Sequence, residues 1–446
     1  MNWIRKYIFS VFPGKIFYRC GFALAFIFFI SFFIPFLYDI ATILFSGLLA
    51  LTIADYFFIF FLGRSLNAKR ITPERLSNGD ENIIKVAIEN RMSFSLKVLI
   101  IDELPYQFQI RDFKLQGKLE SMETKTFEYS LKPVERGDYN FGNVIVFISS
   151  ILGFIKRKQI FNQEKTLSVY PSFLNLRKYQ LIAEATSNES GSKRYRKIGN
   201  SFEFEQIRDY VLGDDIRNLN WKATARHGQL LLNSYVEEKS QQVYCIIDKG
   251  RLMKMPFNGL SLLDYAINST LVLANICIRK LDKTGLVTFS DQEVEMIASD
   301  NKPVQLNKIM QSLYSLKTDF LESNFELLYL KLRQNLQQRS ILIMFTNFES
   351  LNSLRRQLPY LRLISKYHLL VVIFFENTEL LNLTNAKAKS IEDVYLKTMA
   401  EKNVYEKRLI IKEFKRHGIN TILSQPENLS VQVINKYLEL KSRQAI

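Results

Sequence analysis

Two long apolar runs near the N-terminus constrain this chain more than any other feature. Residues 21–38 and 40–62 are nearly uncharged runs of 18 and 23 residues, and only Asp39 separates them. As a helix, each run is long enough to cross a hydrocarbon core of about 30 Å. The short break predicts a tight transmembrane hairpin, with Pro35 in the last turn of its first helix.

The charges beside these runs predict the orientation of the hairpin. Basic residues lie on both outer flanks, namely Arg5, Lys6, Lys15, Arg19, Arg64, Lys69 and Arg70. Positive flanks stay on the cytoplasmic side, so everything after residue 63 is expected in the cytoplasm. A cleaved signal peptide is the competing interpretation, but a second full-length run follows the first. Asp55 is expected near a helix end or against the partner helix, since an ion in lipid is costly.

Composition narrows the classes of partner. The net charge is +16 over 446 residues, but the basic residues are spread along the chain among 44 acids, so no nucleic acid is expected. The densest basic run, Lys193–Lys197, fits either a solvated linker or a contact with phosphate or lipid headgroups. Cys20, Cys245 and Cys277 lie far apart, which predicts neither a disulfide framework nor a zinc site.

Residues 64–172 have the pattern of a small β-sandwich-like domain. The segments Ile83–Glu89, Thr126–Leu131 and Asn143–Ile148 read as strands, and glycine-containing turns separate such segments. This domain fits either an inert spacer or a sheet that binds a peptide. Apolar periodicity fades over residues 173–198, which predicts a linker.

From residue 243 to 446 strands alternate with helices, which predicts a doubly wound α/β domain with a parallel sheet. Helices are expected near 260–278, 303–316, 323–338, 351–358, 398–417 and 427–440. Ligands of such sheets bind beyond the carboxyl ends of the strands, which directs attention to the loop after Asp248.

Residues 199–242, the signature segment, concentrate paired charge beside one of only two tryptophans. Its candidate residues are Arg208, Tyr210, Asp214, Asp215, Arg217, Trp221, Lys222 and Arg226. In one interpretation the charges form a structural network that fastens the α/β domain to this segment, with Trp221 packed beneath. In the other they form a docking surface for a partner protein, because Trp, Tyr and Arg are favoured anchors there.

The signature segment resembles that of the bacterial domain-of-unknown-function 58 family, whose pattern is roughly F-x-x-[LI]-R-x-Y-x-x-G-D-D-x-R-x-[IL]-[DN]-W-K-x-[ST]-A-R-x-G-x-L. The matching positions are Phe204, Ile207, Arg208, Tyr210, Gly213, Asp214, Asp215, Arg217, Leu219, Asn220, Trp221, Lys222, Thr224, Ala225, Arg226, Gly228 and Leu230. The resemblance implies a bacterial inner-membrane protein with a von Willebrand factor A-like (Rossmann-type) domain and a MoxR-type AAA+ ATPase partner. Ser149–Lys156 resembles the family element D-P-[FL]-G-L-F but lacks its Asp and Pro.

Metal-binding members of the von Willebrand factor A-like fold carry D-x-S-x-S after the first strand and an Asp at the end of a later one. Here the corresponding positions are Asp248, Gly250, Leu252 and Asn347. Hard Mg²⁺ prefers oxygen ligands, and two hydroxyls and one carboxylate are missing. A degenerate site without metal or other cofactor is therefore predicted.

No catalytic motif stands out, since the chain has no G-x-x-x-x-G-K-[ST], no G-x-G-x-x-G opening a helix and no G-x-S-x-G. The favoured function is therefore a non-enzymatic, membrane-anchored adaptor or scaffold, with a MoxR-type ATPase as its partner. Two alternatives stay open: a membrane-bound metal-dependent hydrolase, and a module that binds anionic polymers or lipids.

Overall fold

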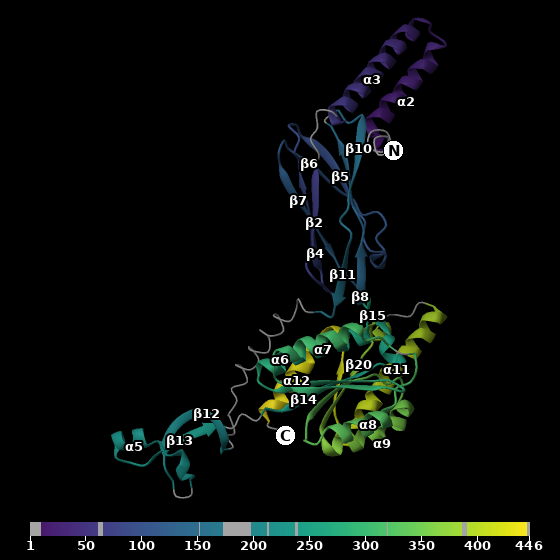
Figure 1. Ribbon diagram of the computed structural model, residues 1–446. Coiled ribbons are helices and arrows are strands. Elements are labelled where there is room, and N and C mark those ends of the chain that lie inside the picture. The colour runs from purple at the N-terminus through teal and green to yellow at the C-terminus, as the bar shows by residue number, and fades with distance from the viewer. Residues whose placement is uncertain are drawn as a thin grey trace. The chain divides into compact units, whose positions relative to one another are not determined.

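The computed structural model describes residues 10–60, 66–150, 152–172, 198–211, 214–236, 240–318, 320–385 and 390–443. Two compact units make up the chain, Met1–Tyr170 and Pro171–Ile446 (Figure 1). The basic run Lys193–Lys197 and the predicted linker, apart from Ile198, lie outside the described residues.

The first unit begins with a helical hairpin of α2 (Lys15–Ser31) and α3 (Phe36–Phe60). The predicted boundaries are wrong, because the break falls at residues 32–35 and not at Asp39. Pro35 cannot donate the backbone bond that would continue α2, whereas its fixed φ suits the start of α3. Asp39 then lies in the first turn of α3, where a carboxylate is favourable.

Only one helix of the described chain, α3, is long and apolar enough to cross a membrane by length and composition. Its 25 residues span about 37 Å. The 17 residues of α2 span about 25 Å, which is short of a typical crossing.

Three contacts join the hairpin to the β domain that follows. The strand β1 (Val11–Pro13) pairs antiparallel with β10 (Ile155–Phe161). The Gly14 amide donates to the Phe154 carbonyl at 2.7 Å, and a Cβ on Gly14 would meet the Gly153 carbonyl oxygen at 2.0 Å. Only glycine therefore allows this approach of backbone to backbone.

The third contact is the side chain of Asp55, which is fully buried near the end of α3. One of its oxygens accepts from the Ser150 hydroxyl, and the other accepts from the Ile155 amide at 2.9 Å. Ser150 occupies the position of the missing family Asp, and its hydroxyl accepts from the amides of Leu152 and Gly153. A serine thus organises this turn without the Asp-Pro pair.

Ten further strands form a β-sandwich-like domain with sheets ordered β1-β10-β9-β5-β6, β2-β4-β7 and β3-β11-β8. They are β2 (Asn67–Ile71), β3 (Leu76–Ser77), β4 (Asn82–Glu89), β5 (Leu96–Asp102), β6 (Leu115–Leu119), β7 (Thr124–Leu131), β8 (Gly137–Phe141), β9 (Val144–Ser149), β10 and β11 (Lys165–Tyr170). The three predicted strands lie in β4, β7 and β9, apart from Asn143, and alternate side chains of β4 and β9 enter the core. Inside, the Arg70 guanidinium binds the Asp102 carboxylate, to which Tyr129 also donates.

The signature segment forms an antiparallel pair, β12 (Ile198–Asp209) and β13 (Leu231–Val236), with the short helix α5 (Trp221–His227) between them. Asn220 begins α5, because its side chain accepts from the Ala223 amide at 2.9 Å. Gly228 ends the helix at φ 68°, where glycine carries no steric penalty.

Beyond the signature segment, the second unit contains a six-stranded sheet ordered β18-β17-β14-β19-β20-β21, parallel except for the edge strand β18, and the short antiparallel pair β15 (Pro256–Phe257) and β16 (Leu260–Ser261). The strands are β14 (Gln242–Asp248), β17 (Lys283–Phe289), β18 (Val294–Asp300), β19 (Ile341–Phe345), β20 (Leu369–Phe375) and β21 (Asn420–Ser424). The helices are α6 (Leu262–Arg279), α7 (Val304–Ser315), α8 (Phe325–Asn335), α9 (Leu351–Tyr367), α10 (Thr378–Asn385), α11 (Ile391–Arg416) and α12 (Leu429–Ser442).

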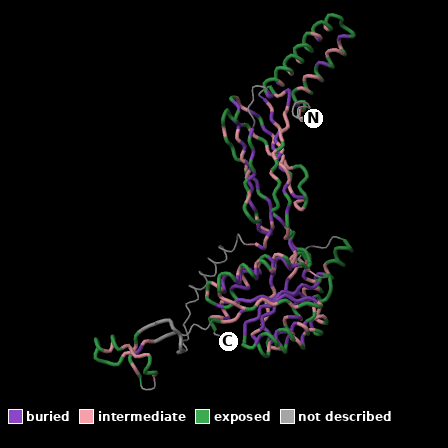
Figure 2. The backbone as a smooth tube through the Cα atoms, in the orientation of Figure 1, coloured by how far each residue is buried: buried purple, intermediate pink, exposed green. Residues whose placement is uncertain are grey.

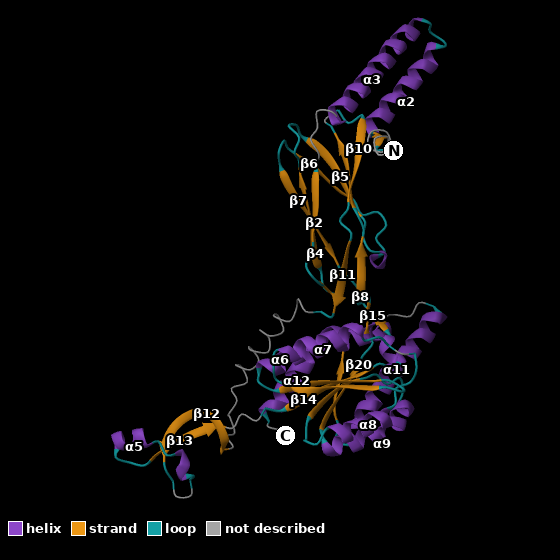
Figure 3. Ribbon diagram, in the orientation of Figure 1, coloured by secondary structure: helices purple, strands orange, loops and turns teal. Residues whose placement is uncertain are grey.

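Helices cover both faces of this sheet (Figure 3), as the alternation of elements predicted. One core joins alternate strand residues to α6, α7 and α12, and the other joins the intervening residues to α8, α9 and α11. Buried residues accordingly follow the strands (Figure 2).

Two predicted helices are longer than expected. The helix α9 runs on to Tyr367 through Pro359, because Leu358, Leu361 and Ile364 continue its buried stripe. That packing outweighs the penalty of about 3 kcal/mol for a proline inside a helix. Ser390 starts α11 with a capping box, eight residues ahead of the predicted start at Thr398.

Candidate functional site

The candidate site lies where the order of the strands reverses. From β14 the chain passes to β17 on one side, and it later returns to β19 on the other side. The carboxyl ends of β14 and β19 therefore border the crevice in which open α/β sheets bind ligands. Asp248 ends β14, and Thr346 and Asn347 follow β19.

Asp248 is buried, and both oxygens of its carboxylate accept hydrogen bonds from the protein. One oxygen accepts from the Gly250 amide at 2.8 Å and from the Ser323 hydroxyl, and the other accepts from the Thr346 hydroxyl at 2.6 Å. Burial raises the pKa of Asp248, and the hydrogen bonds from Ser323, Thr346 and Gly250 oppose that shift.

Asn347 faces a cation that belongs to the protein. Its side-chain oxygen accepts from the Lys407 ammonium at 2.7 Å, and the same ammonium donates to the Phe348 carbonyl at 2.6 Å. Lys407 comes from α11 and is buried, which lowers its pKa to about 8. The amide oxygen that stands in place of the second carboxylate thus already accepts a hydrogen bond from a cation of the protein itself.

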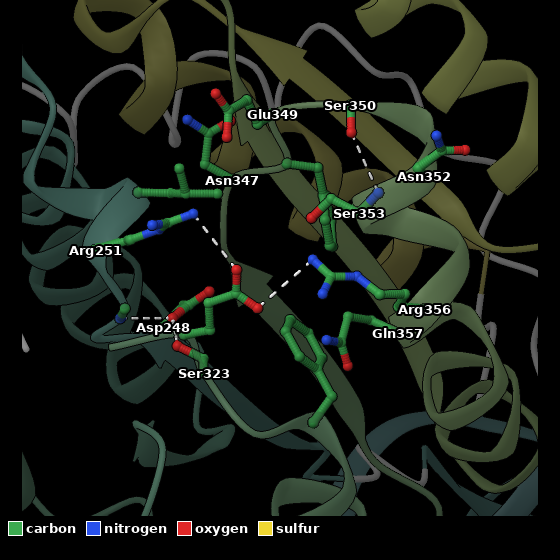
Figure 4. Close-up of a pocket in the computed structure, with 15 residues that line it drawn as sticks. Asp248, Arg251, Ser323, Asn347, Glu349, Ser350, Asn352, Ser353, Arg356 and Gln357 are labelled. Atoms are coloured by element: carbon green, nitrogen blue, oxygen red, sulfur yellow. Dashed lines mark hydrogen bonds and ion pairs between the residues drawn. The ribbon is translucent and has the colours of Figure 1, made fainter. Parts of the chain in front are cut away.

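A pocket of about 310 Å³ opens at this edge of the sheet (Figure 4). All four predicted positions line it: Asp248, Gly250, Leu252 and Asn347. The four positions that the sequence pattern selected therefore lie together around one pocket.

Two arginines enter the pocket from opposite sides. Arg251 lies just after β14 and Arg356 on α9, and Figure 4 shows their guanidinium groups pointing toward one another across the opening. The Glu322 carboxylate lies 3.4 Å from Arg251 and 3.5 Å from Arg356. The three side chains are between 54% and 62% exposed, so this bridge is a surface one.

The residues present do not fit a divalent cation. A Cβ on Gly250 would lie 2.4 Å from the Ser323 oxygen, so the serine of the metal-binding pattern would fit only if the Ser323 hydroxyl turned away from Asp248. The oxygens of Asp248 and Asn347 are already held by protein donors. Within the described parts of the chain, no group of three or more His, Cys, Asp or Glu side chains could hold a metal ion.

Several residues of the site were not among those predicted from the sequence. Ser323 stands one residue before the Asn324 cap of α8, in the loop that follows α7, so a hydroxyl just ahead of a helix cap was a signal that could have been read. Glu322 and Arg356 look like ordinary surface charges in sequence. Lys407 lies on a charged helix whose other lysines give no reason to single it out.

The signature segment is arranged differently from the predicted fastening network. Arg208 forms a bidentate pair with Asp214 at 2.9 and 2.7 Å, which lowers the pKa of Asp214. Asp215 accepts from the Arg217 amide at 3.0 Å and so caps its own turn. Both pairs are local, and Gly213 of the predicted turn lies outside the described residues.

Trp221 is 66% exposed and does not pack beneath this network. Arg217, Lys222 and Arg226 are also exposed, and in the described structure their side chains make no ion pair. Tyr210 is half-buried, and its amide donates to the Leu230 carbonyl at 2.9 Å. Ile216 and Val211 of the same segment are also exposed, at 64% and 61%.

Comparisons with known proteins agree with the family resemblance. Residues 206–401 match the family described as "Protein of unknown function DUF58". A curated relative, "Uncharacterized protein YeaD" of Bacillus subtilis (strain 168), is 27% identical over 239 residues. The match covers 52% of this chain and 56% of that protein, so the chain spans little more than half the length of this relative.

Two solved structures are similar to the chain over about a quarter of its length. A CARDB domain from Pyrococcus furiosus shows 14% identity and a TM-score of 0.18, covering 24% of this chain and 96% of that one. A PapD-like domain of human CEP192 shows 16% identity and a TM-score of 0.19, covering 23% and 84%. On the family match, residues 206–401 are a domain of the DUF58 family, and the chain is a distant homologue of the uncharacterized B. subtilis protein.

Proposed function

We propose that this protein is a membrane-anchored adaptor or scaffold, whose α/β domain is von Willebrand factor A-like and binds another protein at the pocket beside Asp248. The observation that carries the proposal is the engagement of Asp248 and Asn347 by Ser323, Thr346 and Lys407. Because these side-chain oxygens already accept hydrogen bonds inside the protein, we expect the site to recognise a partner by its shape and charge and not through a metal ion.

The strand order with its antiparallel edge supports the von Willebrand factor A-like assignment. The apolar α3, the shorter α2 and the basic flanks support a membrane hairpin that leaves the later domains in the bacterial cytoplasm. The proposed partner is a MoxR-type AAA+ ATPase, and it rests on the family resemblance.

A membrane-bound hydrolase is the second candidate, favoured by the hydroxyls of Ser323 and Thr346 around a buried carboxylate. The tight space at Gly250 counts against it. Binding of anionic polymers or lipids would depend on Lys193–Lys197.

The test is to purify the full chain in detergent with a MoxR-type ATPase of the same organism and follow both by gel filtration. A co-eluting complex, retained when EDTA removes divalent cations from the adaptor before mixing, is the expected result. Absence of any complex, with and without nucleotide, would overturn the ATPase as partner.

A further inference from the structure

We propose that the pocket beside Asp248 binds an acidic side chain of a partner peptide between Arg251 and Arg356, in the place now held by the Glu322 carboxylate. The inference deepens the proposed function, on which it rests, by naming the chemistry of the ligand. Its starting point is that two cations from separate elements meet one carboxylate over an open cavity.

The ion pairs of Glu322 with Arg251 and Arg356 are weak enough for another carboxylate to replace that of Glu322. Its two distances, 3.4 and 3.5 Å, are long for charge-assisted hydrogen bonds, and all three groups are more than half exposed. Exposed pairs of this kind contribute little stability, so an incoming carboxylate loses little by displacing Glu322. Glu322 therefore acts as an internal competitor.

The walls of the pocket fit a carboxylate carried on a short apolar stem. Leu252, Phe325 and Phe348 supply apolar surface, whereas Ser350, Asn352 and Gln357 supply hydrogen-bonding groups. A volume of about 310 Å³ is at the low end for a small-ligand pocket and exceeds what one acidic side chain needs. The remaining space suits the residues on either side of it in a peptide.

The charges that line the pocket favour a single negative charge over a phosphate. Besides Glu322, two further acidic residues line the pocket with Arg251 and Arg356, namely Asp248 and Glu349. A singly charged carboxylate can pair with the two guanidinium groups as Glu322 does now, whereas a phosphate dianion adds repulsion from the neighbouring acids. Arginine also suits the planar carboxylate.

The experiment uses the full chain in detergent and a panel of fluorescent hexapeptides, each with one Asp or Glu between apolar residues, beside Asn or Gln twins. Binding is measured by anisotropy at low salt. We expect acidic peptides to bind and their amide twins to fail. Because the bound peptide covers the charge pair and shields it from water, Arg356→Gln should weaken binding roughly tenfold or more.

Glu322→Gln should strengthen binding roughly twofold to fivefold, the range of an exposed ion pair. Arg355→Gln is the matched control, because Arg355 is the neighbouring residue on α9 and lies 3.9 Å from Glu413, outside the pocket. That variant should bind like the wild type, apart from the loss of one distant charge.

Three results would overturn the proposal: no binding by any acidic peptide to the Glu322→Gln variant, equal losses in Arg355→Gln and Arg356→Gln, or displacement of the peptide by free glutamate or inorganic phosphate at the peptide's own concentration. The last result would assign the pocket to a small anion. Failure of the site is distinguishable from failure of the function. If neither Arg356→Gln nor Glu322→Gln changes the formation of an ATPase complex, the proposed peptide site is wrong but the adaptor function stands. If acidic peptides bind but no ATPase complex forms, only the ATPase is excluded as the partner.

Discussion

At the scale of single residues, the buried charge of Lys407 can be tested directly. Its ammonium lies among Asn347, the Phe348 carbonyl and the ring of Phe374, 5.7 Å from the ring centroid. Burial lowers its pKa from 10.5 to about 8, while Glu349 and Glu376 oppose the shift. The lysine is thus a buried charge whose cost is offset by hydrogen bonds and a cation–π contact.

We expect the stability of the wild type relative to Lys407→Met to rise as the pH increases from about 8 to about 10.5. In that window the unfolded chain still holds the proton that the folded chain has released, so the free energy of unfolding increases with pH. The gain should be about 3 kcal/mol at most. Thermal melting of the full chain in detergent measures it, and Lys412→Met, on an exposed position of α11, is the control. Parallel curves for wild type and Lys407→Met would contradict the assignment.

A second residue-scale prediction concerns Gly250, where a side chain would collide with Ser323. Millimolar Mg²⁺ or Mn²⁺ should give the full chain no saturable rise in melting temperature, because a ligand that binds only the native state must stabilise it. A rise that disappears in Asp248→Ala would show that the site holds a metal after all.

At the scale of elements, the junction between α2 and the β domain depends on one close approach. Gly14→Ala places a methyl group against the Gly153 carbonyl, whereas Gly21 has open space around its Cβ position. We expect Gly14→Ala to lower the melting temperature by several degrees, as a loss of 1–3 kcal/mol from overpacking would roughly do. Gly21→Ala should leave it unchanged, and equal effects of the two changes would refute this account of the junction.

The signature segment supports a different prediction from the one its charges first favoured. Because Arg217 is exposed, Arg217→Ala should change the free energy of unfolding by no more than about 0.5 kcal/mol. Trp221→Ser should be equally mild for stability but should weaken the complex with the partner, since exposed tryptophan is a favoured anchor. A sharp loss of stability in both variants would instead favour the structural interpretation, in which the charges form a fastening network and Trp221 packs beneath it.

The elements also show what could be predicted from sequence. The sandwich could be predicted from the alternation of apolar residues in its strands, and the parallel sheet from the succession of strands and helices, because each fold class follows from a pattern that the sequence shows directly. The end of α9 was missed because a non-local term decides it, since its buried stripe continues through Pro359. The hairpin break was missed although its cause is local, because Pro35 ends α2 and starts α3 ahead of Asp39. Likewise Asp248 and Asn347 were found from a local pattern, whereas Glu322, Arg356 and Lys407 are brought to the pocket only by folding.

At the scale of the whole molecule, the proposed membrane anchor predicts on which side of the membrane each domain lies. Reporters fused after Gly63 and after Ile446 should both signal the cytoplasm, because basic residues flank the apolar stretch on both sides. A reporter at the N-terminus distinguishes the hairpin from a single span. It should signal the cytoplasm if α2 and α3 both cross, and the periplasm if α3 crosses alone. A periplasmic signal from Ile446 would contradict either arrangement.

The contacts of Gly14 and Asp55 have a mechanical consequence. The chain enters the hairpin from a strand of the sandwich, and α3 is bonded to the same loop of that domain through Asp55. Because the hairpin is attached to the sandwich at two points, Gly14 and Asp55, some forty residues apart in sequence, the helices cannot rotate freely relative to the sheet. In the proposed membrane anchor, a tilt of the helices would therefore tilt the sandwich too, and a force on the sandwich would act on the helices as torque.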